Sequence, residues 1–224
     1  MDVIEAIKQR KSIRAFKPDP VPRELLAQVL EVSLRAPSTD NTQPWEFAIV
    51  TGDVLEDLKK ALSARMGQPG EFTPDIPFPV LNYQPPYLDR SKKQGRKVFQ
   101  AMGIARDDWP RRMEWYSYMA RFMEAPVGLI AYVEKYLGAY AILDTGLFLE
   151  NLMLAALAHG LGTCAQMAPV LHPDVLRQRL DIPETKLITC AVAIGYPQDD
   201  APVNQVRSDR EPLETFANWY GFSE

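Results

Sequence analysis

A cluster of cationic and hydroxyl side chains stands close to the start of the chain. The sequence RKSIR, residues 10–14, places Arg10, Lys11, Ser12 and Arg14 within five positions. An amphipathic stretch before it predicts a helix over about residues 2–10. Arg10 and Lys11 would complement the negative C-terminal end of that helix, which leaves Ser12 and Arg14 without a role.

Two more arginines, Arg207 and Arg210, stand near the other end of the chain. A guanidinium group binds phosphate oxygens in pairs, and the sequence contains neither of the common glycine-rich phosphate-binding loops. A phosphate would therefore have to be held by side chains. Two interpretations remain open: these arginines converge with Arg10 and Arg14 on one phosphate-bearing cofactor, or they are ordinary surface residues.

Composition excludes several classes of protein. The 224-residue chain has a net charge of −4 and no basic tail, which argues against nucleic acid or an anionic membrane as the main partner. Cys164 and Cys190 have no metal-binding or disulfide spacing, so we expect no metal and a reducing, cytoplasmic environment. His159 and His172 form no recognisable catalytic set. Any catalysis would therefore be carried by a bound cofactor, with no catalytic side chain of the protein.

Predicted strands and helices alternate along one domain, residues 1–224, which is interrupted by an insertion at about residues 67–124. The first part of the insertion is rich in proline and aromatic residues, a composition that favours a functional loop. Two short helices are expected next, at about 91–102 and 110–123. The remaining expected elements are helices over about 22–36, 54–66, 139–159 and 173–180, strands over about 45–50, 127–133 and 186–197, an extended segment at 163–170, and a short helix after Pro212.

The stretch AYAILDTGLFLENLMLAALAHG, residues 139–160, predicts a long helix that is apolar around most of its circumference. Its longest apolar run is interrupted by Glu150 and Asn151 and is too short to span a bilayer. Such a helix must be covered on all sides. In a domain of this size a second copy of the chain is the simplest cover, so we expect a homodimer.

Four motifs together resemble the FMN-dependent nitroreductase family. RKSIRAF and the APSTDNTQPW that follows it before the first strand form one opening motif, and the other three are LDTGLFLENLMLAALAHGLGTCAQMA, AVAIGYP and RSDREPLETF. These motifs occur in the family's order over nearly the whole chain. The insertion, with PPYLDR, is most similar to the nitrobenzoate reductase-like subgroup. The resemblance implies an α+β fold: a three-layer α/β/α sandwich with a central mixed, largely antiparallel sheet, in an intertwined homodimer.

The resemblance also implies where the cofactor binds. Arg10, Ser12 and Arg14 would hold the FMN phosphate and ribityl chain or the pyrimidine edge of the flavin, with Lys11 contributing mainly its backbone. Pro37, Ser38 and Asn41 would approach the flavin bound mainly to the other subunit. The segment Gln166, Met167 and Ala168 would direct a backbone amide at flavin N5. Arg210, and less clearly Arg207, would bind the phosphate.

The implied activity is that of an FMN-dependent oxidoreductase. NADH or NADPH would reduce the flavin, and a small flat acceptor such as a nitroaromatic or a quinone would then take the electrons in a ping-pong mechanism. Arg90 or Arg121 could pair with a carboxylate on the acceptor. The alternatives are a reductive dehalogenase or an ene-reductase of the same fold, or a flavin-binding protein without turnover. The aromatic side chains available in the insertion to stack on an acceptor are Phe72, Tyr83, Tyr87, Trp115, Tyr118 and Phe122.

Overall fold

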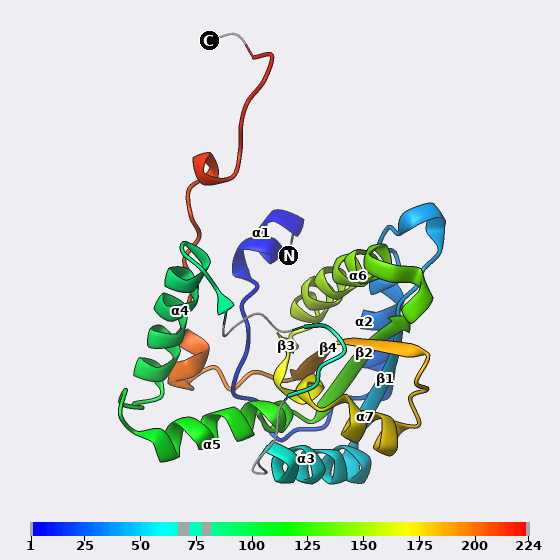
Figure 1. Cartoon of the computed structure of the whole chain (residues 1–224), viewed down its shortest axis with the longest axis vertical. Helices are drawn as coiled ribbons and strands as arrows, with labels where there is room; N and C mark the ends of the chain where they lie inside the picture. The colour runs from blue at the N-terminus through cyan, green and yellow to red at the C-terminus, as the bar shows by residue number, and fades with distance from the viewer. Residues whose placement is uncertain (1, 67–71, 78–81, 223–224) are drawn as a thin grey trace.

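The computed structural model describes residues 2–66, 72–77 and 82–222. A four-stranded sheet runs through the centre of the molecule in the order β1-β2-β4-β3 (Figure 1). All neighbouring strands are antiparallel, and a bulge interrupts the β2–β4 pairing between Ala131 and Tyr132. The strands are β1 (Glu46–Thr51), β2 (Val127–Glu134), β3 (Gly162–Gln166) and β4 (Lys186–Gly195).

Helices cover both faces of this sheet (Figure 1). The order along the chain follows the sequence prediction closely, with ends displaced by a few residues. The longer helices are α1 (Val3–Gln9), α2 (Arg23–Ser33), α3 (Gly52–Met66), α4 (Tyr87–Ala101), α5 (Trp109–Ala120), α6 (Gly138–Ala158) and α7 (Pro173–Leu180). Single turns are η1 (Thr39–Asn41), η3 (Phe122–Glu124), η4 (Lys135–Leu137), η5 (Ala168–Leu171), η6 (Pro202–Gln205) and η7 (Leu213–Thr215).

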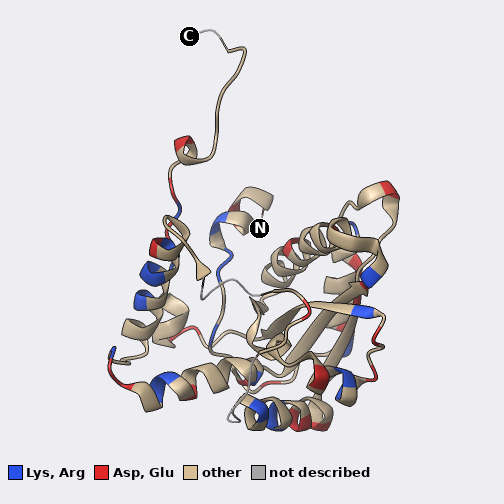
Figure 2. Cartoon of the chain, in the orientation of Figure 1, with Lys and Arg blue, Asp and Glu red and all other residues tan. Residues whose placement is uncertain are grey.

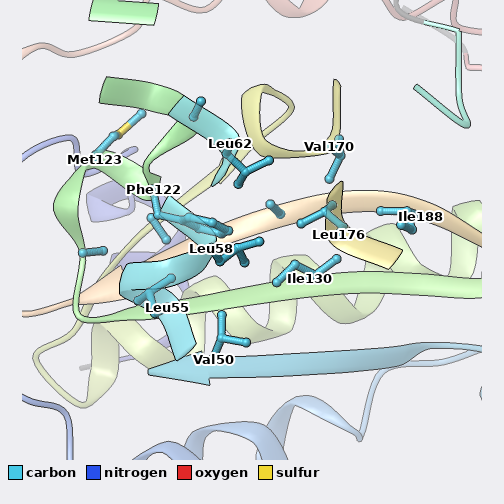
Figure 3. Close-up of a cluster of buried hydrophobic side chains, with 14 of the residues drawn as sticks. Val50, Leu55, Leu58, Leu62, Phe122, Met123, Ile130, Val170, Leu176 and Ile188 are labelled. Carbon is cyan, nitrogen blue, oxygen red and sulfur yellow. The ribbon is translucent and has the colours of Figure 1, made fainter. Parts of the chain in front are cut away.

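One face of the sheet is covered by α3, α7 and the turn η3. Leu55, Leu58 and Leu62 lie at helical spacing on α3 and are almost completely buried against Ile130 of β2 and Ile188 of β4 (Figure 3). Their alternating partners on the strands point to this side because successive strand residues face opposite sides of a sheet. This cluster is the first half of the core.

The other face is covered by α2 and α6. Phe148 of α6 is fully buried and stacks on Trp45 and Phe47, with ring centroids 5.5 Å and 5.2 Å apart. The helix α6 and the preceding turn η4 together cover residues 135–158. This is longer than the apolar run near Glu150 and Asn151 that the sequence analysis judged too short to span a bilayer. By length and composition it could span a membrane, contrary to the prediction from the sequence. It packs on α2 and the sheet, however, as the core helix of a globular domain does.

The insertion contributes α4 and α5, which form a small cluster of their own. Trp115 of α5 packs with Val98 of α4 and with Val203 of η6. The insertion is thus attached to the segment that leads to the C-terminus. Beyond it, residues 211–222, here called the C-terminal arm, extend away from the domain (Figure 1).

Candidate active site

The cationic segment, residues 10–14, lies in an extended conformation along the free edge of β3. The helix α1 begins at Asp2, whose carboxylate accepts a hydrogen bond from Glu5 N at 2.8 Å, and ends at Arg10 with extended backbone angles. Ile13 N then donates to Thr163 O of β3 at 2.9 Å. Ser12 forms an isolated β-bridge with Thr163. This bridge is parallel, whereas the named strands all pair antiparallel. We call residues 10–14 the clamp segment.

Alternation along the clamp segment brings Arg10, Ser12 and Arg14 to one side of it. All three affect the pKa of one thiol, that of Cys164. Burial raises this pKa, and the positive charge of Arg14, a hydrogen bond with Ser12 and the positive charge of Arg10 partly oppose the rise. Arg10 also borders a cavity of about 290 Å³, which it lines together with Lys11, Ile13 and Gly160. Arg10, Ser12 and Arg14 thus lie near one thiol, and their role in holding FMN stays a prediction.

The two arginines of the C-terminal segment are placed differently. Arg207 Nη1 donates to Gln9 O at 2.8 Å, so this arginine reaches the end of α1 beside Arg10. Arg210 is exposed and donates only to the backbone oxygens of Ser208 and Asp209. Within the described chain it forms no hydrogen bond to the clamp segment. In this protomer Arg207 therefore lies at the clamp segment, whereas Arg210, the stronger phosphate ligand by the family resemblance, does not contact it.

The C-terminal segment is also fixed to α4. Asp209 pairs with Lys97 at 2.6 Å and with Lys93 at 2.9 Å, and these lysines lower the pKa of the Asp209 carboxyl to about 2. Lys97 also donates to Arg207 O at 3.3 Å. The helix α4, Arg207 and the end of α1 are thereby joined in one polar network. Figure 2 shows basic and acidic segments on α4 and on the chain that leads toward the C-terminal arm.

Gln166 is the last residue of β3, the strand that the clamp segment borders. Its side chain is 8% exposed, and neither its amide oxygen nor its amide nitrogen has a hydrogen-bond partner in the part of the chain that the structure describes. A buried amide without partners is costly and rare in native proteins. Gln166 therefore marks a place where a ligand with donors and acceptors would be stabilised. Met167 and Ala168, which follow it, are half-buried at the start of η5.

The loop with Pro37, Ser38 and Asn41 lies at the other side of the sheet. It leads into β1, whereas the clamp segment pairs with β3, and these strands form opposite edges. Three strand spacings separate the edges by about 14 Å. One protomer therefore does not bring Ser38 and Asn41 to its own clamp segment.

This loop has an unusual backbone. Asp40, Asn41 and Gln43 all have φ near +50°, a left-handed conformation that non-glycine residues seldom adopt. Gln43 N donates to Ser38 Oγ at 2.9 Å, and Thr39 N donates to Asp144 Oδ2 at 3.0 Å. Asp144 belongs to α6 and is 4% exposed. The loop is therefore held from a rigid core helix.

The predicted acceptor-stacking residues fall into two groups. Phe72 packs against His172, and Phe72 and Tyr87 are half or more exposed, with Tyr83 half-buried. Trp115 is only 5% exposed and Phe122 is fully buried. The prediction that these last two stack on an acceptor is wrong for this protomer, because their rings are occupied by core packing.

Tyr118 is half-buried, and its hydroxyl donates to Arg14 O at 3.0 Å. The suggested carboxylate-binding arginines already have acidic partners. Arg121 pairs with Glu114 and Glu124, and Arg90 lies 3.6 Å from Glu211. Neither is a free cation facing a pocket. The remaining polar partners of Arg121 are the hydroxyls of Ser63 and Ser117.

Comparison with known proteins agrees with this arrangement. The model of the Nitroreductase family matches residues 7–196. The chain is 32% identical to 4-nitrobenzoate reductase of Pseudomonas putida over 99% of this chain and 96% of that protein. Its structure resembles the FMN and NADPH-dependent nitroreductase NfnB from sphigopyxis sp. strain HMH, with a TM-score of 0.95, 32% identity, and coverage of 99% of this chain and 100% of that one.

A second solved structure gives the same result. It is the FMN-dependent nitroreductase NfnB from Mycobacterium smegmatis in complex with NADPH, with a TM-score of 0.90, 31% identity, and coverage of 98% of this chain and 100% of that one. The predicted α/β/α fold class is confirmed by these neighbours. A match over most of the chain at both levels shows that this protein belongs to the nitroreductase family.

Proposed function

We propose that this protein is an FMN-dependent oxidoreductase that takes electrons from NADPH or NADH and reduces nitroaromatic or similarly flat acceptors. The observation that carries the proposal is the clamp segment. Arg10, Ser12 and Arg14 lie near one another, and Arg207 reaches the end of α1 just before Arg10. At the end of the strand that the clamp segment borders, the buried amide of Gln166 has no partner among the described residues. Solved FMN and NADPH-dependent nitroreductases share the whole fold.

The residues present suit a phosphate-bearing flavin. Arg14 has no carboxylate partner among the described residues, whereas Arg10 lies 3.5 Å from Glu150. An unneutralised guanidinium beside a serine hydroxyl attracts a phosphate or another anionic group. Arg10, Ser12, Arg14 and Arg207 would hold the phosphate end or the polar edge of the flavin, and Gln166 with Met167 would border its ring.

When bound, FMN supplies hydride acceptance and electron transfer, which protein side chains do not provide. The chain contributes binding, orientation and charge. Cations at the polar edge of the flavin favour the more negative, reduced form. Burial lowers the pKa of His172 and raises that of Cys164, so we assign neither group a proton-transfer role. Solvent can protonate a nitro or quinone oxygen.

We further propose that the site is completed in a homodimer. Apolar side chains are exposed on three elements that would otherwise face water, and the C-terminal arm has no lysine or arginine beyond Arg210 (Figure 2). The cytoplasmic location and the lack of metal and membrane partners that we expect from the sequence stay proposals. These exposed residues are Val3, Ile4 and Ile7 of α1, Tyr140, Leu143 and Leu147 of α6, and Leu213, Phe216, Trp219, Tyr220 and Phe222 of the arm.

The second subunit would bring its Pro37, Ser38 and Asn41 to the flavin. Because these residues are separated from the clamp segment of their own protomer by the width of the sheet, a shared site explains how both sets could serve one cofactor. The exposed rings of Phe72 and Tyr87 and the half-buried ring of Tyr83, all in the insertion, would then border the acceptor.

Anaerobic reduction tests the proposal. The FMN-loaded protein should lose its oxidised-flavin absorbance when NADPH or NADH is added, and should regain it when 4-nitrobenzoate or nitrobenzene follows. Light scattering after gel filtration should give twice the mass of one chain. An Arg14→Ala variant should bind FMN weakly, while Arg23→Ala, a change at an exposed arginine of α2, should bind normally. Protein that binds no FMN would refute the proposal, and flavin that NAD(P)H leaves oxidised would identify a storage protein.

A further inference from the structure

One buried side chain binds the backbone of both Arg14 and Ala15. Asn204 of η6 is 1% exposed. Its Oδ1 accepts hydrogen bonds from Arg14 N at 2.7 Å and from Ala15 N at 3.2 Å. Its Nδ2 donates to Ala15 O at 2.7 Å and to Gln198 O at 2.9 Å. Both donors and both acceptor positions of this amide are therefore used.

A second side chain reaches the same backbone from another direction. Tyr118 of α5 donates its hydroxyl hydrogen to Arg14 O at 3.0 Å. Burial, with a contribution from Glu124, raises the pKa of Tyr118 to about 12, so the hydroxyl remains a donor at neutral pH. The backbone N and O of Arg14 are thus bonded to residues 190 and 104 positions away in the sequence.

These contacts matter because of what Arg14 would do. A long arginine side chain loses considerable rotational freedom when it binds a ligand, which costs free energy of binding. If its backbone is already fixed, only the side chain has to be ordered, and this cost is smaller. Arg14 is also the clamp arginine without a carboxylate partner in the described chain, so little else orients its charge. Its Nη1 donates only to Ser12 O, at 3.3 Å.

We infer that Tyr118 and Asn204 are positioning residues that fix the Arg14 backbone so that its guanidinium is directed at the bound flavin nucleotide. The inference rests on the proposed function, and it gives Tyr118 a role different from stacking on the acceptor. It also joins the insertion to the cofactor site, because Tyr118 lies on α5, and joins the C-terminal segment to it through Asn204.

The decisive variant is Tyr118→Phe, which removes one hydroxyl and keeps the ring. We expect its dissociation constant for FMN, measured by quenching of flavin fluorescence, to rise about fivefold, the equivalent of about 1 kcal/mol. Tyr116→Phe is the matched control, since Tyr116 is half-buried on the same helix and its hydroxyl has no hydrogen bond among the described residues. It should bind FMN as the wild type does.

The same substitution is then made in an Arg14→Ala background. If Tyr118 acts through the Arg14 side chain, its loss should have less than a twofold effect there, whereas general damage to the fold would weaken binding equally in both backgrounds. Equal losses in the two backgrounds, or unchanged binding by Tyr118→Phe, would overturn the inference.

Asn204→Asp extends the test to the second residue. It keeps both acceptor bonds but replaces two donors with an acceptor facing Ala15 O and Gln198 O, so we expect a larger loss of FMN affinity than for Tyr118→Phe. If this variant fails to fold, the Tyr118 cycle still decides the question. Wild-type protein that binds no FMN would instead refute the proposed function, and this inference with it.

Discussion

A single methyl group added at Gly162 should disturb the clamp segment. A Cβ atom at this position would lie 2.6 Å from Ile13 Cγ1 and 3.0 Å from both Cβ and Cγ2 of Ile13. Non-bonded carbon atoms prefer separations of about 3.5–4.0 Å, so the two must move apart by about 1 Å. Ile13 is 6% exposed and its amide is bonded to Thr163 O, which leaves it little room.

Overpacking of this kind costs about 1–3 kcal/mol of unfolding free energy. We therefore expect Gly162→Ala to unfold at a lower urea concentration than the wild type at the same protein concentration, with an unchanged slope. FMN affinity should fall as well, because Ile13 lies between Ser12 and Arg14. Gly95→Ala is the control: Gly95 lies inside α4 with no atom near its added methyl, so the variant should be as stable as the wild type or up to about 1 kcal/mol more stable.

A double variant identifies the cause. Ile13→Ala alone should destabilise the protein by leaving a cavity, and Gly162→Ala should partly fill that space when the two are combined. The loss in the double variant should then be smaller than the sum of the single losses. Two results would contradict the packing of the clamp segment on β3. One is a urea midpoint of Gly162→Ala equal to that of the wild type, and the other is a loss of unfolding free energy in the double variant equal to the sum of the single losses.

Three further predictions concern the groups that support the site. Asp144→Ala should weaken FMN binding by releasing Thr39 N, whereas Asp144→Asn, which keeps an acceptor oxygen, should stay closer to the wild type in the same fluorescence titration. The pKa of Tyr118 is raised from 10.0 to about 12 in the folded protein. The stability that this hydroxyl contributes is therefore complete below pH 10 and is lost as the pH rises from 10 to 12. In that range the urea midpoint of the wild type should fall more steeply with pH than the midpoint of Tyr118→Phe. Burial raises the pKa of Cys190 to about 11 and also raises that of Cys164, so at about pH 8 both should resist a thiolate-specific reagent in the native state and react after unfolding.

Local signals in the sequence were sufficient for most of the secondary structure. Asp2 and Glu5 stand at the start of α1, Pro110 lies in the first turn of α5, and Gly160 follows the end of α6. Such caps and breakers act within a few residues, which is why a single sequence reveals them. The alternation that brings Arg10, Ser12 and Arg14 to one side is equally local.

Burial inside the insertion was not predictable in the same way. Trp115, Tyr118 and Phe122 recur at helical spacing, and that spacing fits a face turned toward a pocket or a face turned toward a core. The structure places Trp115 and Phe122 in the core because η6 and the sheet cover them. The choice depends on which distant element packs against the helix, and helical periodicity carries no information about it.

The same limit applies to Asn204 and Asp144, to which the sequence assigned no role, although Asp144 stands in one of the family-like motifs. Both act over more than one hundred residues of sequence, one on Arg14 and the other on Thr39. The partner of each is therefore defined only by the fold. Buried polar side chains of this kind are rarely retained without partners, so burial combined with hydrogen bonding, rather than residue type, identifies them.

Asn204 and Asp144 also show how the two halves of the proposed site are kept in shape. The clamp segment and the loop at Ser38 have little regular structure, namely one bridge to β3 in the first and the single turn η1 in the second. In each case one buried side chain from another element bonds the backbone: Asn204 at Arg14, and Asp144 at Thr39. The left-handed residues of the loop cost free energy that only such external fixation can offset. Both halves are therefore formed before a cofactor binds, so that the free energy of binding is not spent on ordering them.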